Sequence, residues 1–156
     1  MIEIRIPGWQ NLRLDHLVLD YNGTMACDGA LLPGVRTALQ SLSGSFQVHI
    51  LTADTFGKVG GEVEGLSCML SVLPPEQQDV AKRDYITRLD ASRVVCIGNG
   101  RNDRLMLAAA ALGIAVVQEE GAATEALGAA DVVCPSILSA LNLLSSPLRL
   151  VATLRS

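Results

Sequence analysis

Six short apolar runs, separated by segments with helical patterning, constrain the fold of this chain more than any other feature of its sequence. Each run is too short to form a helix. Strands that alternate with helices are typical of βα units, which build a parallel sheet with helices on its faces. The sequence therefore predicts a single α/β domain over residues 1–156, a Rossmann-like three-layer sandwich. The runs are Leu17–Asp20, Gln47–Leu51, Cys68–Leu73, Val94–Ile97, Ile114–Val117 and Val132–Cys134.

The segments around these runs complete the predicted architecture. Residues 2–6 and 12–15 flank Pro7 and Gly8, so an N-terminal antiparallel β-hairpin is expected before the first central strand. The sheet is expected to be mostly parallel, with its first five central strands in the order 3-2-1-4-5. Helices are expected from Pro33 to Leu42, near residues 55–64 in a short or irregular form, from Val80 to Leu89, from Leu105 to Leu112, and at about 121–128 and 136–144.

Composition and charge exclude several classes of function. The net charge is −4 and only five residues are aromatic, so neither a basic stripe nor a base-stacking platform is expected, and nucleic acid is not a predicted partner. No apolar run approaches the roughly 20 residues that span a bilayer. The first residues alternate charged with apolar side chains and do not resemble a signal peptide. A cytoplasmic protein without a membrane partner is expected.

The cysteines and histidines do not form a recognisable metal motif. The four cysteines include no CxxC pair and have no histidine at zinc-ligand spacing. Cys68, Cys96 and Cys134 interrupt apolar runs and are expected in the core. His16 and His49 are lone histidines at strand positions, so a structural role is expected for both.

Polar residues follow three of the predicted strands, at the edge where an open parallel sheet binds its ligands. Asp20 ends the first central strand, Thr52 follows the second, and the turn Asn99–Asp103 follows the fourth. In the order 3-2-1-4-5 the first strand lies between the other two. Neighbouring strands are about 4.8 Å apart, so these residues are expected to converge.

The residue types at this edge favour phosphoryl chemistry. Asp20 is a carboxylate open to in-line attack on phosphorus, and Thr52 offers a hydroxyl to a phosphate oxygen. Gly23 and Thr24 are expected to present backbone amides to an anion. Asp103 and the Asn99 amide oxygen supply hard oxygen ligands for Mg²⁺. A lysine is still needed to neutralise the phosphate.

Four segments together resemble the haloacid dehalogenase (HAD) superfamily. Asp20-Tyr21-Asn22-Gly23-Thr24 is similar to its first motif, DxDGT, and Gly98-Asn99-Gly100-Arg101-Asn102-Asp103 is similar to its fourth, GDGxND. Thr52 matches the second motif and Lys82 the third. Within the superfamily the chain most resembles soluble counterparts of the P-type ATPase phosphorylation domain. The resemblance implies an aspartyl phosphate on Asp20, a Mg²⁺ cofactor held by Asp20, Asn22, Asn99 and Asp103, and phosphate binding by Gly23, Thr24, Thr52 and Lys82.

The lysine of the site has two candidates. If the third helix starts right after Pro75, Lys82 lies two turns along it and falls short of the site; if Asp79 is the N-cap, Lys82 points toward the site. Lys58, early in the second helix, is the alternative.

Two positions depart from the superfamily pattern. Asn22 stands where an aspartate usually transfers protons, and Asn99 stands where an aspartate usually binds magnesium. General acid–base catalysis contributes roughly 10²- to 10⁴-fold, so slow turnover is expected. The prediction is a magnesium-dependent phosphohydrolase; the alternative is a phosphate- or metal-binding regulatory module of the same fold.

The spacing between the motifs leaves no room for the cap domain that often selects substrates in this superfamily. Thr24 to Thr52 and Thr52 to Lys82 each hold only one helix, one strand and loops. An open site is expected, acting on a small phosphorylated substrate or a phosphorylated macromolecule. A second copy of the chain covering the site is the alternative.

Overall fold

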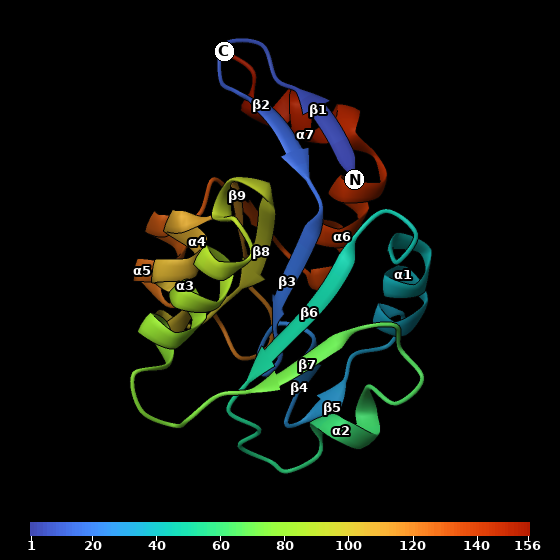
Figure 1. Cartoon of the computed structure of the whole chain (residues 1–156), viewed down its shortest axis with the longest axis vertical. Helices are drawn as coiled ribbons and strands as arrows, with labels where there is room; N and C mark the ends of the chain where they lie inside the picture. Colours follow the sequence, from blue (N-terminus) through green and yellow to red (C-terminus); the bar gives the residue numbers. More distant parts are fainter.

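The computed structural model describes all 156 residues and contains a six-stranded sheet in which every neighbouring pair of strands is parallel (Figure 1). Its strands are β3 (His16–Asp20), β6 (Gln47–Thr52), β7 (Met69–Val72), β8 (Val94–Gly98), β9 (Leu112–Val116) and β10 (Val132–Cys134). The order is β7-β6-β3-β8-β9-β10. The predicted order of the first five central strands is therefore confirmed, and β10 extends the sheet beyond β9.

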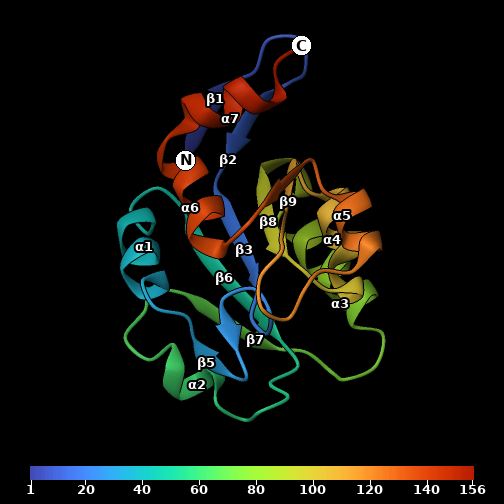
Figure 2. The ribbon, with the colours of Figure 1, turned by 180° about the vertical axis from the view of Figure 1, so that it is seen from behind.

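Helices cover both faces of the sheet. Figures 1 and 2 show α1 and α6 on one face and α3, α4 and α5 on the other. Side chains of a strand point alternately to the two faces, so Leu17 and Leu19 join the core under α1 and α6, and Val18 joins the core under α3 and α4. The helices are α1 (Val35–Leu42), α2 (Val59–Glu62), α3 (Gln78–Arg88), α4 (Arg104–Ala109), α5 (Thr124–Ala129), α6 (Ile137–Ser145) and α7 (Pro147–Leu154), with short 3₁₀ turns η1 (Ala91–Arg93) and η2 (Arg101–Asp103).

The predicted N-terminal hairpin is present as a separate two-stranded antiparallel sheet. Its strands are β1 (Ile2–Arg5) and β2 (Asn11–Leu14). The inner side chains Ile4 and Leu12 are buried, and α7 lies against the hairpin at one end of the molecule (Figure 2). Leu150 of α7 is completely buried, so the apolar C-terminal segment packs on this same domain.

The connections from the first to the third motif are short. After β3 come a small hairpin of β4 (Ala26–Cys27) and β5 (Ala30–Leu31) and then α1. Between β6 and α3 the chain forms only α2 and β7. The second helix is short, as its glycines predict.

Some helix boundaries differ from the predicted ones: α1 begins at Val35 and not at Pro33, and the end of α4 was predicted wrongly. Helix α4 ends at Ala109, whereas the sequence predicts it through Leu112. Leu112 instead begins β9, where it pairs with Val95 of β8. After the helix, Ala110 has an extended backbone conformation, and the N–H of Ala111 donates to the carbonyl of Ala91 outside the helix.

The lengths of the helices and the burial of the cysteines bear on two further predictions. No single helix is long and apolar enough to cross a membrane; α6 and α7 reach the required length only together, and they are bent by 102°. All four cysteines are free. Cys96 and Cys134 are buried as expected, whereas Cys68, like Cys27, is half-buried.

Candidate active site

The carboxyl ends of β3, β6 and β8 meet at one edge of the sheet and bring the predicted motifs together. Asp20 pairs with Leu51 in the parallel register, which places Thr52 one residue beyond it. The neighbouring pair Leu19 and Ile97 sets the Asn99 turn on the other side of β3. Asp20, Thr52 and Asn99 are all buried. The predicted convergence at this edge is therefore present.

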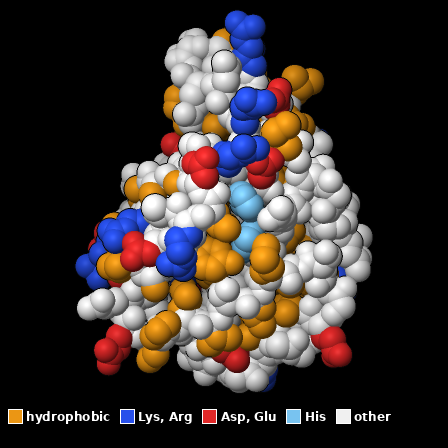
Figure 3. All heavy atoms as spheres, in the orientation of Figure 1, with side chains coloured by type: hydrophobic (Ala, Val, Ile, Leu, Met, Phe, Trp, Pro, Cys, Tyr) orange, Lys and Arg blue, Asp and Glu red, His pale blue; other side chains and the backbone are white.

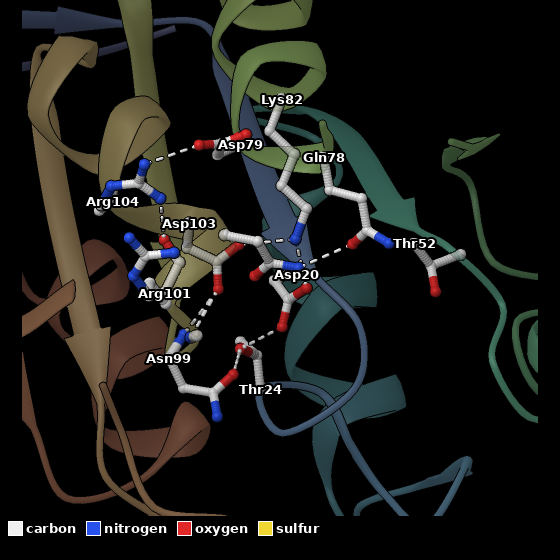
Figure 4. Close-up of polar contacts among 12 residues, drawn as sticks. Asp20, Thr24, Thr52, Gln78, Asp79, Lys82, Asn99, Arg101, Asp103 and Arg104 are labelled. Atoms are coloured by element: carbon white, nitrogen blue, oxygen red, sulfur yellow. Dashed lines mark hydrogen bonds and ion pairs between the residues drawn. The ribbon is translucent and has the colours of Figure 1, made fainter. Parts of the chain in front are cut away.

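Lys82 is the centre of the arrangement. Its Nζ lies 2.7 Å from Oδ1 of Asp20 and 2.6 Å from Oδ1 of Asp103. The lysine side chain is only 1% exposed, and Figure 4 shows it reaching from α3 with its ammonium beside Asp20. Helix α3 begins at Gln78, between the two starts considered from the sequence, and the extended lysine spans the remaining distance. Lys58 is exposed at the N-cap of α2 and makes no contact with this group.

Burial and charge act in opposite directions on the three groups. Burial, together with the Asp103 carboxylate, raises the pKa of Asp20 to about 6 against the lowering effect of Lys82. Burial disfavours the Lys82 ammonium, but the two carboxylates outweigh it and raise the lysine pKa above its ordinary value. With both carboxylates ionised the cluster carries one excess negative charge. A phosphate dianion would therefore require further positive charge at this edge.

Asp103 also fixes the turn after β8. Its Oδ2 accepts hydrogen bonds from the backbone N–H groups of Asn99 (3.0 Å) and Gly100 (2.8 Å). Gly98 is required for this packing, because a Cβ there would lie 2.6 Å from Cγ of Asp103. Asp103 thus binds Lys82 through one oxygen and the turn through the other.

Thr24 and Gly23 connect the first motif to the same turn. The Thr24 hydroxyl donates to Oδ2 of Asp20 at 2.9 Å and lies 3.3 Å from Oδ1 of Asn99. Gly23 has φ +81°, and a Cβ there would lie 2.4 Å from Nδ2 of Asn99. The first and fourth motifs are therefore in close contact, with the backbone of Gly23 against the side-chain amide of Asn99.

The expectation that Gly23 and Thr24 present backbone amides to a phosphate was wrong. The Gly23 N–H donates to the carbonyl of Ala26 at 2.8 Å, and the Thr24 N–H donates to that of Tyr21 at 3.2 Å. These bonds close the tight turn after β3, so neither amide is left for a ligand. Thr24 acts at the site through its side chain instead.

Two other predicted residues have unused hydrogen-bonding capacity. The Asn22 side-chain oxygen is buried and has no partner. The Thr52 hydroxyl oxygen accepts the N–H of Asp54 at 2.9 Å, which leaves its proton free to donate. Unsatisfied buried polar atoms are rare, so these groups suit a bound polar ligand.

Gln118, which was not predicted from the sequence, holds the first motif in place through hydrogen bonds. Nε2 of Gln118 donates to the carbonyls of Gly23 and Thr24, and its Oε1 accepts the N–H of Ile137. Gln118 lies two residues after β9. Asp20 and Thr52 were identified as polar residues at or just after the end of a strand. The same criterion, applied to the fifth strand, identifies Gln118.

The oxygen atoms at this edge are of the type that binds a divalent cation such as Mg²⁺. Asp20 and Asp103 are the two carboxylates, Asn99 offers an amide oxygen, and the Asn22 backbone carbonyl accepts no hydrogen bond within the chain. No group of three or more His, Cys, Asp or Glu residues forms a metal site by itself. The excess negative charge and the unpartnered Asn22 oxygen nevertheless favour a cation.

Comparison with known proteins finds similarity in sequence and in structure. No protein-family model matches the sequence. The chain is 44% identical to the uncharacterized protein MJ0073 of Methanocaldococcus jannaschii over 63 residues, which are 40% of this chain and 68% of that protein.

The structural relatives share one fold. A candidate HAD family hydrolase from Streptomyces avermitilis has a TM-score of 0.68 at 21% identity and covers 91% of this chain and 87% of its own. A 3-deoxy-D-manno-octulosonate 8-phosphate phosphatase from Moraxella catarrhalis, solved with magnesium, phosphate and KDO, has a TM-score of 0.66 at 14% identity and covers 88% and 92%. A zinc-transporting P-type ATPase matches 78% of this chain with 20% of its own, at a TM-score of 0.59 and 24% identity.

Proposed function

The chain belongs to the same family as MJ0073 and has the HAD fold, and from this premise we propose that it is a magnesium-dependent phosphohydrolase that forms an aspartyl phosphate on Asp20. The observation that carries the proposal is the buried Lys82 ammonium, held between Asp20 and Asp103 at the carboxyl edge of the sheet. A structural relative of the same fold, the Moraxella phosphatase, was solved with magnesium and phosphate, which supports this reading.

Asp20 is the proposed nucleophile. One of its carboxylate oxygens bonds to phosphorus while the ester P–O bond breaks. The electron pair of that bond leaves with the alcohol oxygen, which takes a proton from solvent water. Lys82 keeps its positive charge beside the carboxylate, and the free Thr52 proton donates to a phosphate oxygen. In the second step a water oxygen bonds to phosphorus and the Asp20–phosphorus bond breaks, which releases phosphate and regenerates the carboxylate.

A magnesium ion at this edge, held by Asp20, the Asn22 carbonyl and Asn99 with Asp103 nearby, would supply positive charge that stabilises the phosphoryl group. Asn99 is a neutral ligand where a carboxylate would bind more tightly, so the proposed affinity for magnesium is low.

Asn22 makes the proposed reaction slow. An amide neither gives a proton to the leaving oxygen nor takes one from the attacking water. Loss of a general acid–base group costs roughly 10²- to 10⁴-fold in rate. We therefore expect a longer-lived aspartyl phosphate than in a phosphatase with aspartate at this position.

The decisive measurement is phosphate release from a panel of phosphomonoesters in the presence of magnesium. The matched control is Asp20→Asn, which removes the nucleophile and keeps the size of the side chain. We expect turnover above this control and its loss when magnesium is chelated. Equal rates for the two proteins would refute the phosphohydrolase.

A second candidate function is a phosphate- or metal-binding regulatory module without useful hydrolysis. Asn22 and Asn99 favour it, because each replaces a carboxylate that the chemistry of this site uses. The double variant Asn22→Asp and Asn99→Asp separates the two functions, since both changes preserve side-chain shape. A gain of about 10² or more in rate indicates impaired acid–base and metal chemistry. No gain favours the regulatory module.

The surroundings of the site bear on its substrate and location. The segments after Asp20 and after Thr52 contain only short elements, so we propose an uncapped site. Such a site is open to a small phosphorylated substrate or to a phosphorylated macromolecule. We further propose that the protein is cytoplasmic. Coverage of the site by a second copy of the chain remains the alternative, and the oligomeric state in solution distinguishes the two.

A further inference from the structure

We propose that a polar recess, formed by the two segments that carry Lys82 and Asp103, binds the leaving group of the phosphate ester. Arg101 in this recess selects leaving groups that carry a second anionic group, a carboxylate or another phosphate. The inference rests on the proposed phosphohydrolase function and names its substrate class. It concerns side chains that the catalytic arrangement does not use.

The recess lies between the start of α3 and the junction of η2 with α4, and its volume is about 350 Å³. The same two segments carry the lysine and the aspartate of the site: Gln78 lies one helical turn before Lys82, and Asn102 directly precedes Asp103. Nδ2 of Asn102 donates to Oε1 of Gln78 at 2.7 Å and joins the two walls. Figure 4 shows Gln78 beside Lys82, with its side chain directed toward Asp20 and Thr52.

The chemistry of the lining excludes an apolar leaving group. Apart from Pro75, the lining consists of glutamine, asparagine, aspartate and arginine side chains. Figure 3 shows basic side chains gathered over the face that α3, α4 and α5 cover, with acidic ones among them. The volume matches a small molecule and is at the lower end of the usual range for ligand pockets, roughly 300–1,000 Å³.

One of the two arginines in the recess has a fixed structural role. Nη2 of Arg104 lies 2.7 Å from Oδ2 of Asp79, and its Nη1 donates to the carbonyl of Arg101 at 2.9 Å. Both side chains of this ion pair are largely buried, with exposed fractions of 26% and 23%. Arg104 and Asp79 therefore neutralise each other and hold the wall together.

Arg101 is the cation left for a ligand. Its Nε contacts Oε1 of Glu125 at 3.1 Å, but its two terminal nitrogens make no hydrogen bond within the chain. The side chains are 69% and 49% exposed, and such exposed pairs contribute only about 0–1 kcal/mol. An anionic group with two oxygens can therefore take the planar guanidinium in a bidentate pair at little cost.

The test compares two substrates that differ by one carboxylate, glycerol 3-phosphate and 3-phosphoglycerate, with p-nitrophenyl phosphate as the measure of basal activity. We expect the wild type to have a lower KM for 3-phosphoglycerate than for glycerol 3-phosphate. Arg101→Gln should raise the KM for 3-phosphoglycerate roughly tenfold, as loss of a charged hydrogen bond predicts, and leave the other two substrates unchanged.

Two further variants distinguish recognition from a general effect of charge. Arg83→Gln removes another surface arginine, less exposed than Arg101, which pairs with Asp84 within α3 and lies outside the recess. This variant should leave every KM unchanged. Glu125→Gln frees Arg101 from its partner and should lower the KM for 3-phosphoglycerate. A preference that depends on Arg101 should also weaken at high salt.

The outcomes separate this inference from the proposed function. Hydrolysis of p-nitrophenyl phosphate without a preference for the carboxylate, or with a preference that Arg101→Gln preserves, refutes the subsite and leaves the phosphohydrolase intact. If no ester is hydrolysed, the proposed function fails, and calorimetric binding of the two three-carbon phosphates decides the subsite. Tighter binding of 3-phosphoglycerate that is lost in Arg101→Gln supports it, and equal binding overturns it.

Discussion

The Lys82 ammonium lies between two buried carboxylates and offsets their mutual repulsion. Replacing it by methionine preserves much of the side-chain volume and removes the charge. We expect Lys82→Met to abolish phosphatase activity and to lower the free energy of unfolding by about 3–5 kcal/mol at neutral pH, the usual cost of leaving buried charges unpaired. Urea denaturation with an activity assay measures both effects.

Lys58→Met is the matched control for this prediction. Lys58 is exposed and has no ion-pair partner, so its removal should change stability by no more than about 0.5 kcal/mol and leave activity intact. Equal losses in the two variants would contradict the assignment of Lys82 to the site.

Much of the candidate site could be predicted from residue types and their order in the sequence. Asp20, Lys82 and Asp103 converge because each follows or faces the end of a buried parallel strand. The use of the Gly23 and Thr24 amides could not be predicted, because it depends on how the next residues turn back. The carbonyl of Ala26 accepts the hydrogen bond of the Gly23 N–H, and no pattern in the sequence predicts that contact.

At the scale of elements, the contact between α4 and β9 depends on a glycine. A Cβ on Gly113 would lie 2.4 Å from the backbone oxygen of Leu107, which cannot move without shifting the helix. Gly113→Ala should lower the free energy of unfolding by about 1–3 kcal/mol, the usual cost of overpacking. The midpoint of urea denaturation reports the change.

Gly128→Ala is the control, with the opposite expected sign. Gly128 lies inside α5, and a Cβ there meets nothing within 4 Å. Alanine is favoured over glycine in a helix by about 1 kcal/mol, so this variant should be more stable than the wild type. Destabilisation of both variants to the same extent would show that close contact is not the cause at Gly113.

The same region explains why some elements could not be predicted. Strand order followed from the alternation of apolar runs and helical segments, and it is confirmed. The end of α4 did not follow, because Leu105–Val117 is apolar throughout apart from Gly113 and contains no polar residue to separate helix from strand. Helix α7 was not among the predicted helices; it packs against β1, so its place depends on a contact between the two ends of the chain.

At the scale of the whole molecule, a chain of three side chains connects the sheet to α3. Nδ1 of His16 lies 3.1 Å from Nε2 of His49, and Nδ1 of His49 lies 2.9 Å from the Tyr85 hydroxyl. The expectation that the histidines are structural fits this chain, although they are not isolated. Burial, with His16 beside it, lowers the pKa of His49 to about 4.

This low pKa predicts a loss of stability in mild acid. In the unfolded chain His49 titrates near its ordinary pKa of about 6.5, so the unfolded state takes up a proton first as the pH falls. The contribution of His49 to stability is complete above pH 6.5 and is lost between about 6.5 and 4, to a maximum of about 3 kcal/mol. Chemical denaturation at a series of pH values measures this loss.

His49→Gln removes the titrating group and is compared with the wild type at each pH. The difference in unfolding free energy between the two proteins should be constant above pH 6.5 and change by up to about 3 kcal/mol on acidification to pH 4. Parallel pH profiles over this interval would show that His49 does not titrate in this way.

The cluster of Lys82 with its two aspartates also has a consequence for how the chain folds. Lys82 is 62 residues from Asp20 and 21 from Asp103, so the three charges come from separate βα units. None of them can be desolvated cheaply until the others are in place. We therefore expect the carboxyl edge of the sheet to assemble after the rate-limiting step, so that variants of this cluster speed unfolding more than they slow folding, as stopped-flow kinetics would measure.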